Sequence, residues 1–216
     1  MTDRITDTVV LLHGIHTGPW IMKTLGRRLL HAGFSPVYFG YASLKRTPRE
    51  HARALADFVR SRRLAPCHFV AHSLGGLVLR HLADLAPELV QARVVTLGTP
   101  HRGSMVARRL HERFPKLIGR AWDEGLDGRL PLPPMPVATG NISGCRGIGA
   151  GWWLAKLPPG SDGTVAQSET VLPGSLPLLL PCSHTGLLFD RNAARQTACF
   201  LSYGRFLPQI TPQQAA

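Results

Sequence analysis

The amino-acid sequence predicts an α/β protein with a mostly parallel central sheet and helices on both of its faces. Short runs rich in Val, Leu and Phe alternate along the chain with longer segments of helical periodicity. Hydrophobic residues make up 44% of the 216 positions, enough for a sizeable core, so we expect a single domain over residues 1–216. The sequence contains no internal repeat and no run of 18 apolar residues, which argues against a solenoid and a membrane-spanning helix.

The first half of the chain contains the clearest elements. Strands are predicted at 9–12, 37–39, 68–71 and 94–97, and their continuous apolar composition is typical of strands buried on both faces. Helices are predicted at 20–32, from Thr47-Pro48-Arg49-Glu50 onward, and at 74–86. Gly33 suits the end of the first helix, and Thr47 with Glu50 forms a capping box at the start of the second.

The second half is less regular. Further strands are predicted at 137–139 and 176–180, the latter weakened by its proline, and a last helix at 192–201. Within 101–136, apolar residues fall on one helical face, arginines crowd the others, and Pro115 should divide the helix. Residues 130–134 form a proline-rich connector. We expect either a solvated surface helix, or a small flap over a site, or a basic surface that meets anionic lipid. The apolar residues of that face are Val106, Leu110, Phe114 and Leu117.

The net charge, the N-terminal segment and the cysteines indicate which partners, location and cofactors to expect. Lys and Arg number 25 against 13 acidic residues, a net charge of +12, which favours attraction to anionic surfaces. Only five apolar or small residues precede His13, too few for a secretory signal, so we expect a cytoplasmic protein, with peripheral membrane contact as an option. The four cysteines form no C-x-x-C pair, so we expect no metal or redox cofactor and interpret them as small buried hydrophobes. They are Cys67, Cys145, Cys182 and Cys199.

The strongest chemical signal is Ala71-His72-Ser73-Leu74-Gly75-Gly76, where a serine stands between a buried strand and a helix. Small residues two positions before and after a serine allow the sharp turn of a nucleophile elbow, which exposes the hydroxyl at the sheet edge. The backbone N–H of Leu74, at the start of the helix, can then face a developing oxyanion. The plainer interpretation is a capped helix that follows a strand.

The first strand ends in His13-Gly14-Ile15, and Gly14 permits a loop geometry that presents the Ile15 N–H as a second oxyanion donor. We interpret His13 as a structural histidine that holds this loop. His13 and His16 form H-x-x-H, but neither a carboxylate nor a cysteine lies close in sequence, so a metal site is not expected.

An activated serine needs a base and an acid that orients the base, and an elbow of this type is followed along the chain by the acid and then the histidine. Asp162 lies in Gly160-Ser161-Asp162-Gly163-Thr164, a loop of small residues. His184 follows the last apolar run. Chain order and loop position therefore select Asp162 and His184 as partners of Ser73, although each alone also suits a turn or a helix end.

These segments together resemble the α/β-hydrolase superfamily, and within it the small bacterial lipases and esterases. Further matching pieces are Thr-Leu-Gly-Thr-Pro-His-Arg-Gly-Ser at 96–104 and His-Thr-Gly-Leu-Leu at 184–188. The resemblance runs in family order across residues 8–205, with Ala71 in place of the usual first glycine of the elbow. It implies cofactor-free hydrolysis of carboxylic esters, with Ser73 as nucleophile, His184 as base, Asp162 as orienting acid, and Ile15 and Leu74 as oxyanion donors. His101 is usually structural in such proteins.

The length of the chain leaves room for a minimal cap at most, so we expect an open site for small-molecule or lipid acyl esters. An acyltransferase or thioesterase would use the same residues. A second hypothesis, motivated by the charge, is a basic peripheral membrane-binding protein on a hydrolase fold. Nucleic acid is not an expected partner, because aromatic residues are only 7% and do not alternate with basic ones.

Overall fold

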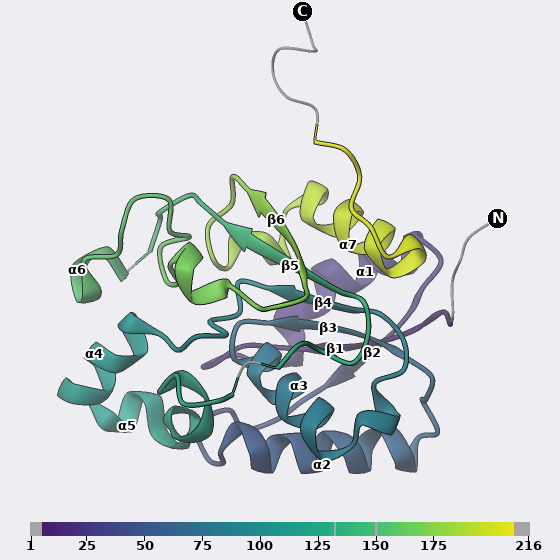
Figure 1. The fold of residues 1–216 in the computed structure, drawn as a ribbon, viewed down its shortest axis with the longest axis horizontal. Helices are drawn as coiled ribbons and strands as arrows, with labels where there is room; N and C mark the ends of the chain where they lie inside the picture. The colour runs from purple at the N-terminus through teal and green to yellow at the C-terminus, as the bar shows by residue number, and fades with distance from the viewer. Residues whose placement is uncertain (1–5, 132, 150, 210–216) are drawn as a thin grey trace, which may run out of the picture.

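The computed structural model describes residues 6–131, 133–149 and 151–209, without the side chains of Trp152 and Trp153. In this part of the chain, six strands form one parallel sheet in the order β2-β1-β3-β4-β5-β6 (Figure 1). The strands are β1 (Thr8–Leu12), β2 (Ser35–Phe39), β3 (His68–His72), β4 (Val94–Leu97), β5 (Thr139–Gly144) and β6 (Leu176–Leu180). The α-helices are α1 (Lys23–His31), α2 (Pro48–Ser61), α3 (Leu74–Leu85), α4 (Met105–Arg113), α5 (Pro115–Ile118), α6 (Gly151–Ala155) and α7 (Arg191–Tyr203). Short helical turns occupy Pro19–Met22, Pro87–Leu89, Gly119–Ala121, Trp122–Leu126, Gln167–Thr170 and Gly186–Leu188.

Helices cover both faces of the sheet, which confirms the predicted α/β class. Alternate residues of β1 face opposite ways, because side chains alternate along a strand. Val9 and Leu11 join the core beneath α1 and α7, whereas Val10 and Leu12 join the core beneath α2 and α3. Figure 1 shows these two pairs of helices on opposite sides of the sheet. Burial on both faces explains why the strand is apolar throughout.

Local signals place several helix ends as predicted. The Glu50 N–H donates to Thr47 Oγ1 at 3.2 Å and the Thr47 N–H donates to Glu50 Oε2 at 2.7 Å, which completes the capping box. Gly33 follows the last residues of α1 with φ of +85°, a conformation that glycine adopts without a steric penalty. The predicted helix at 20–32 is, however, divided into a short turn at Pro19–Met22 and α1.

The strand predicted at 137–139 is wrong in its position. Strand β5 covers Thr139–Gly144 and contains Gly140, Asn141 and Ser143, so it lacks the apolar run that marks the other strands. Strand β6 lies at the predicted residues 176–180 despite its proline. It is the last strand in the order, and a proline without an N–H is tolerated at such an edge.

The segment 101–136 packs over the start of α3. Pro115 begins α5 directly after α4, so it divides the segment as predicted. Leu74 and Leu77 of α3 share a cluster with Ala107 and Ile118 of this segment, and Ile15 packs against the cluster. Figure 1 shows α4 and α5 at one end of the sheet. The apolar face predicted for this helix is only partly buried, because Phe114 and Leu117 are 56% and 48% exposed.

The remaining sequence predictions have mixed outcomes. All four cysteines are free, but only Cys67 and Cys182 are buried, so the prediction of buried cysteines is wrong for Cys145 and Cys199. Leu132 of the predicted connector and residues 1–4 lie outside the described residues. Among the residues described, no helix is both long and apolar enough to cross a membrane.

Candidate active site

Ser73 lies at the sharp turn between β3 and α3. Its backbone has φ of +53° and ψ of −122°, a conformation rarely adopted by residues other than glycine and often found at functional sites. The Ser73 N–H donates to Leu97 O at 2.9 Å, which ties the turn to the end of β4. Gly75 lets the helix start pass close to β1, because a Cβ there would lie 2.7 Å from His13 O. The sequence therefore folds into the elbow geometry expected of it.

Asp162 and His184 form a buried pair, and their exposed fractions are 1% and 8%. His184 Nδ1 lies 2.7 Å from Asp162 Oδ2, and the His184 backbone N–H donates to Asp162 O at 2.9 Å. The other carboxylate oxygen accepts the N–H groups of Thr164 and Val165 at 2.9 and 2.7 Å. The loop amides thus hold the carboxylate in place, and the carboxylate in turn fixes the tautomer of the imidazole, leaving Nε2 available as a base.

Gly98 brings the pair next to the elbow. It follows Leu97, whose carbonyl holds Ser73, and a Cβ on Gly98 would lie 3.0 Å from His184 Nδ1 and 3.2 Å from Asp162 Oδ2. Within the described residues, the Ser73 hydroxyl and the His184 imidazole do not form a hydrogen bond. Such contacts are often long in enzymes without substrate and tighten when the substrate binds.

The loop after β1 is held by His13. The Tyr41 N–H donates to His13 Nε2 at 3.3 Å, so Nδ1 carries the proton and donates to Gly14 O at 2.8 Å. The Tyr41 hydroxyl donates to His13 O at 2.6 Å, and the two rings stack with centroids 4.2 Å apart. Burial lowers the pKa of His13. These contacts agree with a structural role for this histidine.

Both candidate oxyanion donors lie beside the elbow. A Cβ on Gly14 would lie 3.1 Å from Ser73 Cβ, so the chain that leads into Ile15 passes directly beside the nucleophile. Leu74 is the first residue of α3, so its N–H has no acceptor within the helix. The residue before Ile15 thus lies against the Ser73 side chain, and Leu74 directly follows Ser73 in the chain.

His101 is buried in the turn after β4. Its Nε2 lies 3.3 Å from Thr96 Oγ1, and its backbone carbonyl accepts a hydrogen bond from Arg80 at 2.9 Å. Burial lowers the pKa of His101 to about 3, so it is neutral at physiological pH. It holds the turn after β4 and lies outside the predicted triad.

Sequence analysis missed Glu169, which links the segment 101–136 to the loop of Asp162. Its carboxylate accepts the N–H groups of Met105 at 2.5 Å and Ala166 at 2.8 Å, and its backbone carbonyl accepts the Arg102 N–H at 3.0 Å. Burial raises the pKa of this carboxyl. Its sequence signal is that it is the only acidic residue between positions 163 and 189.

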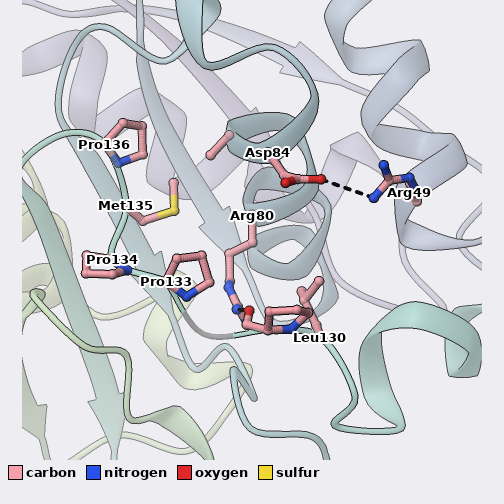
Figure 2. Close-up of a pocket in the computed structure, with 10 residues that line it drawn as sticks. Arg49, Arg80, Asp84, Leu130, Pro133, Pro134, Met135 and Pro136 are labelled. Carbon is pink, nitrogen blue, oxygen red and sulfur yellow. Dashed lines mark hydrogen bonds and ion pairs between the residues drawn. The ribbon is translucent and has the colours of Figure 1, made fainter.

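A cavity of 380 Å³ lies along α3, outside this site (Figure 2). Figure 2 shows Arg80 and Asp84 of α3 on one side, Arg49 of α2 paired with Asp84, and the proline-rich connector on the other side. An α-helix rises 1.5 Å per residue, so Arg80 is about 10 Å along the axis from Ser73. Arg80 is buried and donates to the carbonyls of His101 and Pro131, which anchors the connector.

Comparisons with known proteins identify the family and the fold. The family model described as "Alpha/beta hydrolase family" matches residues 9–206. A triacylglycerol lipase from Pseudarthrobacter phenanthrenivorans is 55% identical over 40 residues, which span 18% of this chain and 12% of the lipase.

Solved structures share the architecture along most of the chain. A mature lipase from Bacillus licheniformis superposes with a TM-score of 0.74 at 16% identity and covers 95% of both chains. A thioesterase of the prodiginine pathway from Streptomyces coelicolor gives a TM-score of 0.60 at 15% identity, covering 90% of this chain and 89% of its own. At these identities the two structures show a shared fold alone.

Proposed function

Because this chain belongs to the alpha/beta hydrolase family, we propose that it is a serine hydrolase that cleaves carboxylic esters through Ser73, His184 and Asp162. The observation that carries the proposal is the buried contact of 2.7 Å between His184 Nδ1 and Asp162 Oδ2, next to the strained turn of Ser73. The 40-residue match to a triacylglycerol lipase supports an ester as the substrate.

The reaction follows from the roles of these groups. His184 Nε2 takes the proton of the Ser73 hydroxyl as its oxygen attacks the acyl carbon. The N–H groups of Ile15 and Leu74 stabilise the negative charge that develops on the acyl oxygen. The alcohol leaves with the proton from His184, and water then hydrolyses the acyl-enzyme by the same steps. Asp162 takes up no proton in these steps, and its carboxylate stabilises the imidazolium. Neither a metal nor a cofactor takes part in this mechanism.

Labelling with a fluorophosphonate, followed by peptide mapping, tests the assignment of the nucleophile. We expect a single covalent adduct on Ser73, and we expect Ser73→Ala to lower kcat by about 10⁴-fold on chromogenic esters. A chain that binds but does not catalyse would remain unlabelled. A Ser73→Ala variant with ordinary activity on short acyl esters would contradict the assignment.

We propose that the substrates have short to medium acyl chains, because the segment 101–136 offers only a small cover over the site. A series of esters from acetate to palmitate tests this preference. Maximal rates on long-chain emulsions, with activation at the interface, would contradict it. Thioesters and acyl transfer to other acceptors use the same groups, so the same series should include a thioester and an added alcohol acceptor.

In addition to the substrate, we propose an anionic membrane surface as a partner. Phe114 and Leu117 are exposed at the end of α4 and in α5, and Arg113 and Lys116 lie next to them in sequence. Apolar side chains flanked by cations favour binding to anionic lipid. Co-sedimentation with vesicles that contain phosphatidylserine, but not with phosphatidylcholine vesicles, should occur at low salt and be lost in Phe114→Ser/Leu117→Ser. Equal binding to both kinds of vesicle would contradict the proposal.

A further inference from the structure

His72, the residue before the nucleophile, contacts the loop that carries His184. It is the last residue of β3 and is 5% exposed. Its Nε2 lies 3.1 Å from the backbone carbonyl oxygen of His184, and the two imidazole rings have centroids 4.7 Å apart. A carbonyl oxygen only accepts hydrogen bonds, so this contact assigns the proton of His72 to Nε2.

The opposite edge of the His72 ring lies against the loop after β1. Its Nδ1 is buried and has no hydrogen-bond partner among the described residues. A Cβ on Gly14 would lie 3.1 Å from this Nδ1 and 3.1 Å from Ser73 Cβ. The ring therefore fills the space between the loop of the oxyanion donors and the loop of His184. Burial, together with the nearby His184, lowers the pKa of His72 to about 3, so it adds no positive charge beside the base at neutral pH.

His184 lies in a loop between β6 and the short turn Gly186–Leu188, and among the described residues three hydrogen bonds hold it there. The backbone carbonyl of Asp162 accepts the backbone N–H of His184, and the Asp162 carboxylate binds the ring Nδ1 of His184. The backbone carbonyl of His184 accepts a hydrogen bond from His72 Nε2. Since His72 and Ser73 are consecutive residues at the end of β3, this one hydrogen bond connects the loop of the base directly to the strand that carries the nucleophile.

We propose that His72 is a positioning residue that sets the distance between His184 and Ser73 by donating its Nε2–H to the carbonyl of His184. The inference rests on the proposed function, since it concerns the same triad. A misplacement of about 1 Å between reacting groups costs about 100-fold in rate. Loss of this bond should therefore lower kcat and leave KM nearly unchanged, because substrate binding does not use it.

The experiment compares His72→Phe with His72→Gln in the full chain. Phenylalanine keeps a ring of similar size but has no donor, whereas the glutamine amide places an N–H near the position of Nε2. Rates are expressed per active serine, titrated with a fluorophosphonate, so that misfolded protein does not count. We expect His72→Phe to lower kcat per titrated site by about 10- to 100-fold with KM within about twofold, and His72→Gln to recover most of the loss.

His81→Phe is the matched control. His81 is also buried, and it lies on α3 about 12 Å along the helix axis from Ser73. Its Nε2 lies 2.6 Å from the carbonyl oxygen of Glu124. Its loss should lower Tm and leave kcat per titrated site unchanged. If His72→Phe does not fold, His72→Asn replaces it, because the shorter amide does not reach the carbonyl of His184.

The outcomes separate this inference from the proposed function. A wild-type chain that is neither labelled nor active would overturn both. An active wild type with unchanged kcat per site in the variants without a donor would overturn only the role of His72. Equal loss in His72→Phe and His72→Gln would show that the ring itself, and not its donated hydrogen bond, is needed, and would also overturn the proposal.

Discussion

Because Gly98 has no side chain, the His184 imidazole can pack directly against its backbone. Its φ is +57°, and a Cβ added to it would lie 3.0 Å from His184 Nδ1, 3.1 Å from Cε1 and 3.2 Å from Asp162 Oδ2. A residue with a side chain is strained at this φ and would also press against the ring and the carboxylate. The residue after β4 thus has two separate reasons to be glycine, one in the backbone and one in the site.

Gly98→Ala should therefore impair catalysis more than folding. We expect a loss of about 1–2 kcal/mol in the free energy of unfolding and a fall in kcat of at least about tenfold. Urea unfolding and ester kinetics measure the two effects. Gly204→Ala is the control, because Gly204 has φ of +70° after α7 and the atoms nearest to an added Cβ belong to the side chain of Arg93. It should lose similar stability and keep its kcat; equal kinetic loss in both variants would argue against a specific role for Gly98.

Asp162→Asn should lower kcat by about 10³- to 10⁴-fold. The carboxylate accepts hydrogen bonds through both oxygens, from loop amides on one side and from His184 on the other. An amide has one accepting atom, so either the loop loses its acceptor or an N–H₂ group faces the imidazole and favours the wrong tautomer. Ester kinetics per titrated serine measure the effect. Asp84→Asn, which breaks an ion pair with Arg49 on the surface, should retain full activity.

Glu169→Gln should loosen α4. Glutamine offers one acceptor oxygen, so the N–H of either Met105 or Ala166 loses its partner, at a cost of about 1–3 kcal/mol. Limited trypsin digestion within α4, at Arg108 and Arg109, should become about 5- to 100-fold faster, since 1.4 kcal/mol corresponds to a factor of ten. The exposed Glu112, paired with Arg109, provides the control variant Glu112→Gln. Unchanged cleavage in Glu169→Gln would mean that other contacts hold the helix.

Stability should decrease as the pH falls from about 6.5 towards 3. Burial lowers the pKa values of His72 and His101 to about 3, whereas both groups bind protons below their ordinary value of 6.5 in the unfolded chain. The unfolded state therefore binds more protons in this window, and each histidine contributes a loss of about 1.4 kcal/mol per pH unit. Their contribution is complete above pH 6.5.

Urea unfolding at pH 7, 6, 5 and 4 measures this slope. His101→Gln removes one of the two groups and should flatten the pH dependence by about 1.4 kcal/mol per unit between pH 6 and 4. If His101→Gln kept the wild-type slope, burial of His101 would not be a cause of acid destabilisation.

Local patterns in the sequence were sufficient to predict most of the sheet and the elbow. Val9–Leu12 is recognisable as a strand because burial on both faces makes all four residues apolar. Thr47 and Glu50 mark a helix start because they form a hydrogen bond between near neighbours in sequence. Strand β5 escaped prediction because Gly140, Asn141 and Ser143 are held by pairing with β4 and β6 and not by apolar residues of their own. Its position is therefore set by its neighbouring strands and not by its own composition.

The sequence by itself was enough to propose which side chains carry the chemistry, through the turn at Ser73 and the order of Asp162 and His184 along the chain. It did not determine what holds them. Glu169 also precedes His184, and only the folded chain shows that its carboxylate binds the amides of Met105 and Ala166 while Asp162 binds the imidazole. Contacts such as that of His72 with His184, 112 residues apart, depend on where parallel strands end in space, and no local pattern encodes that distance.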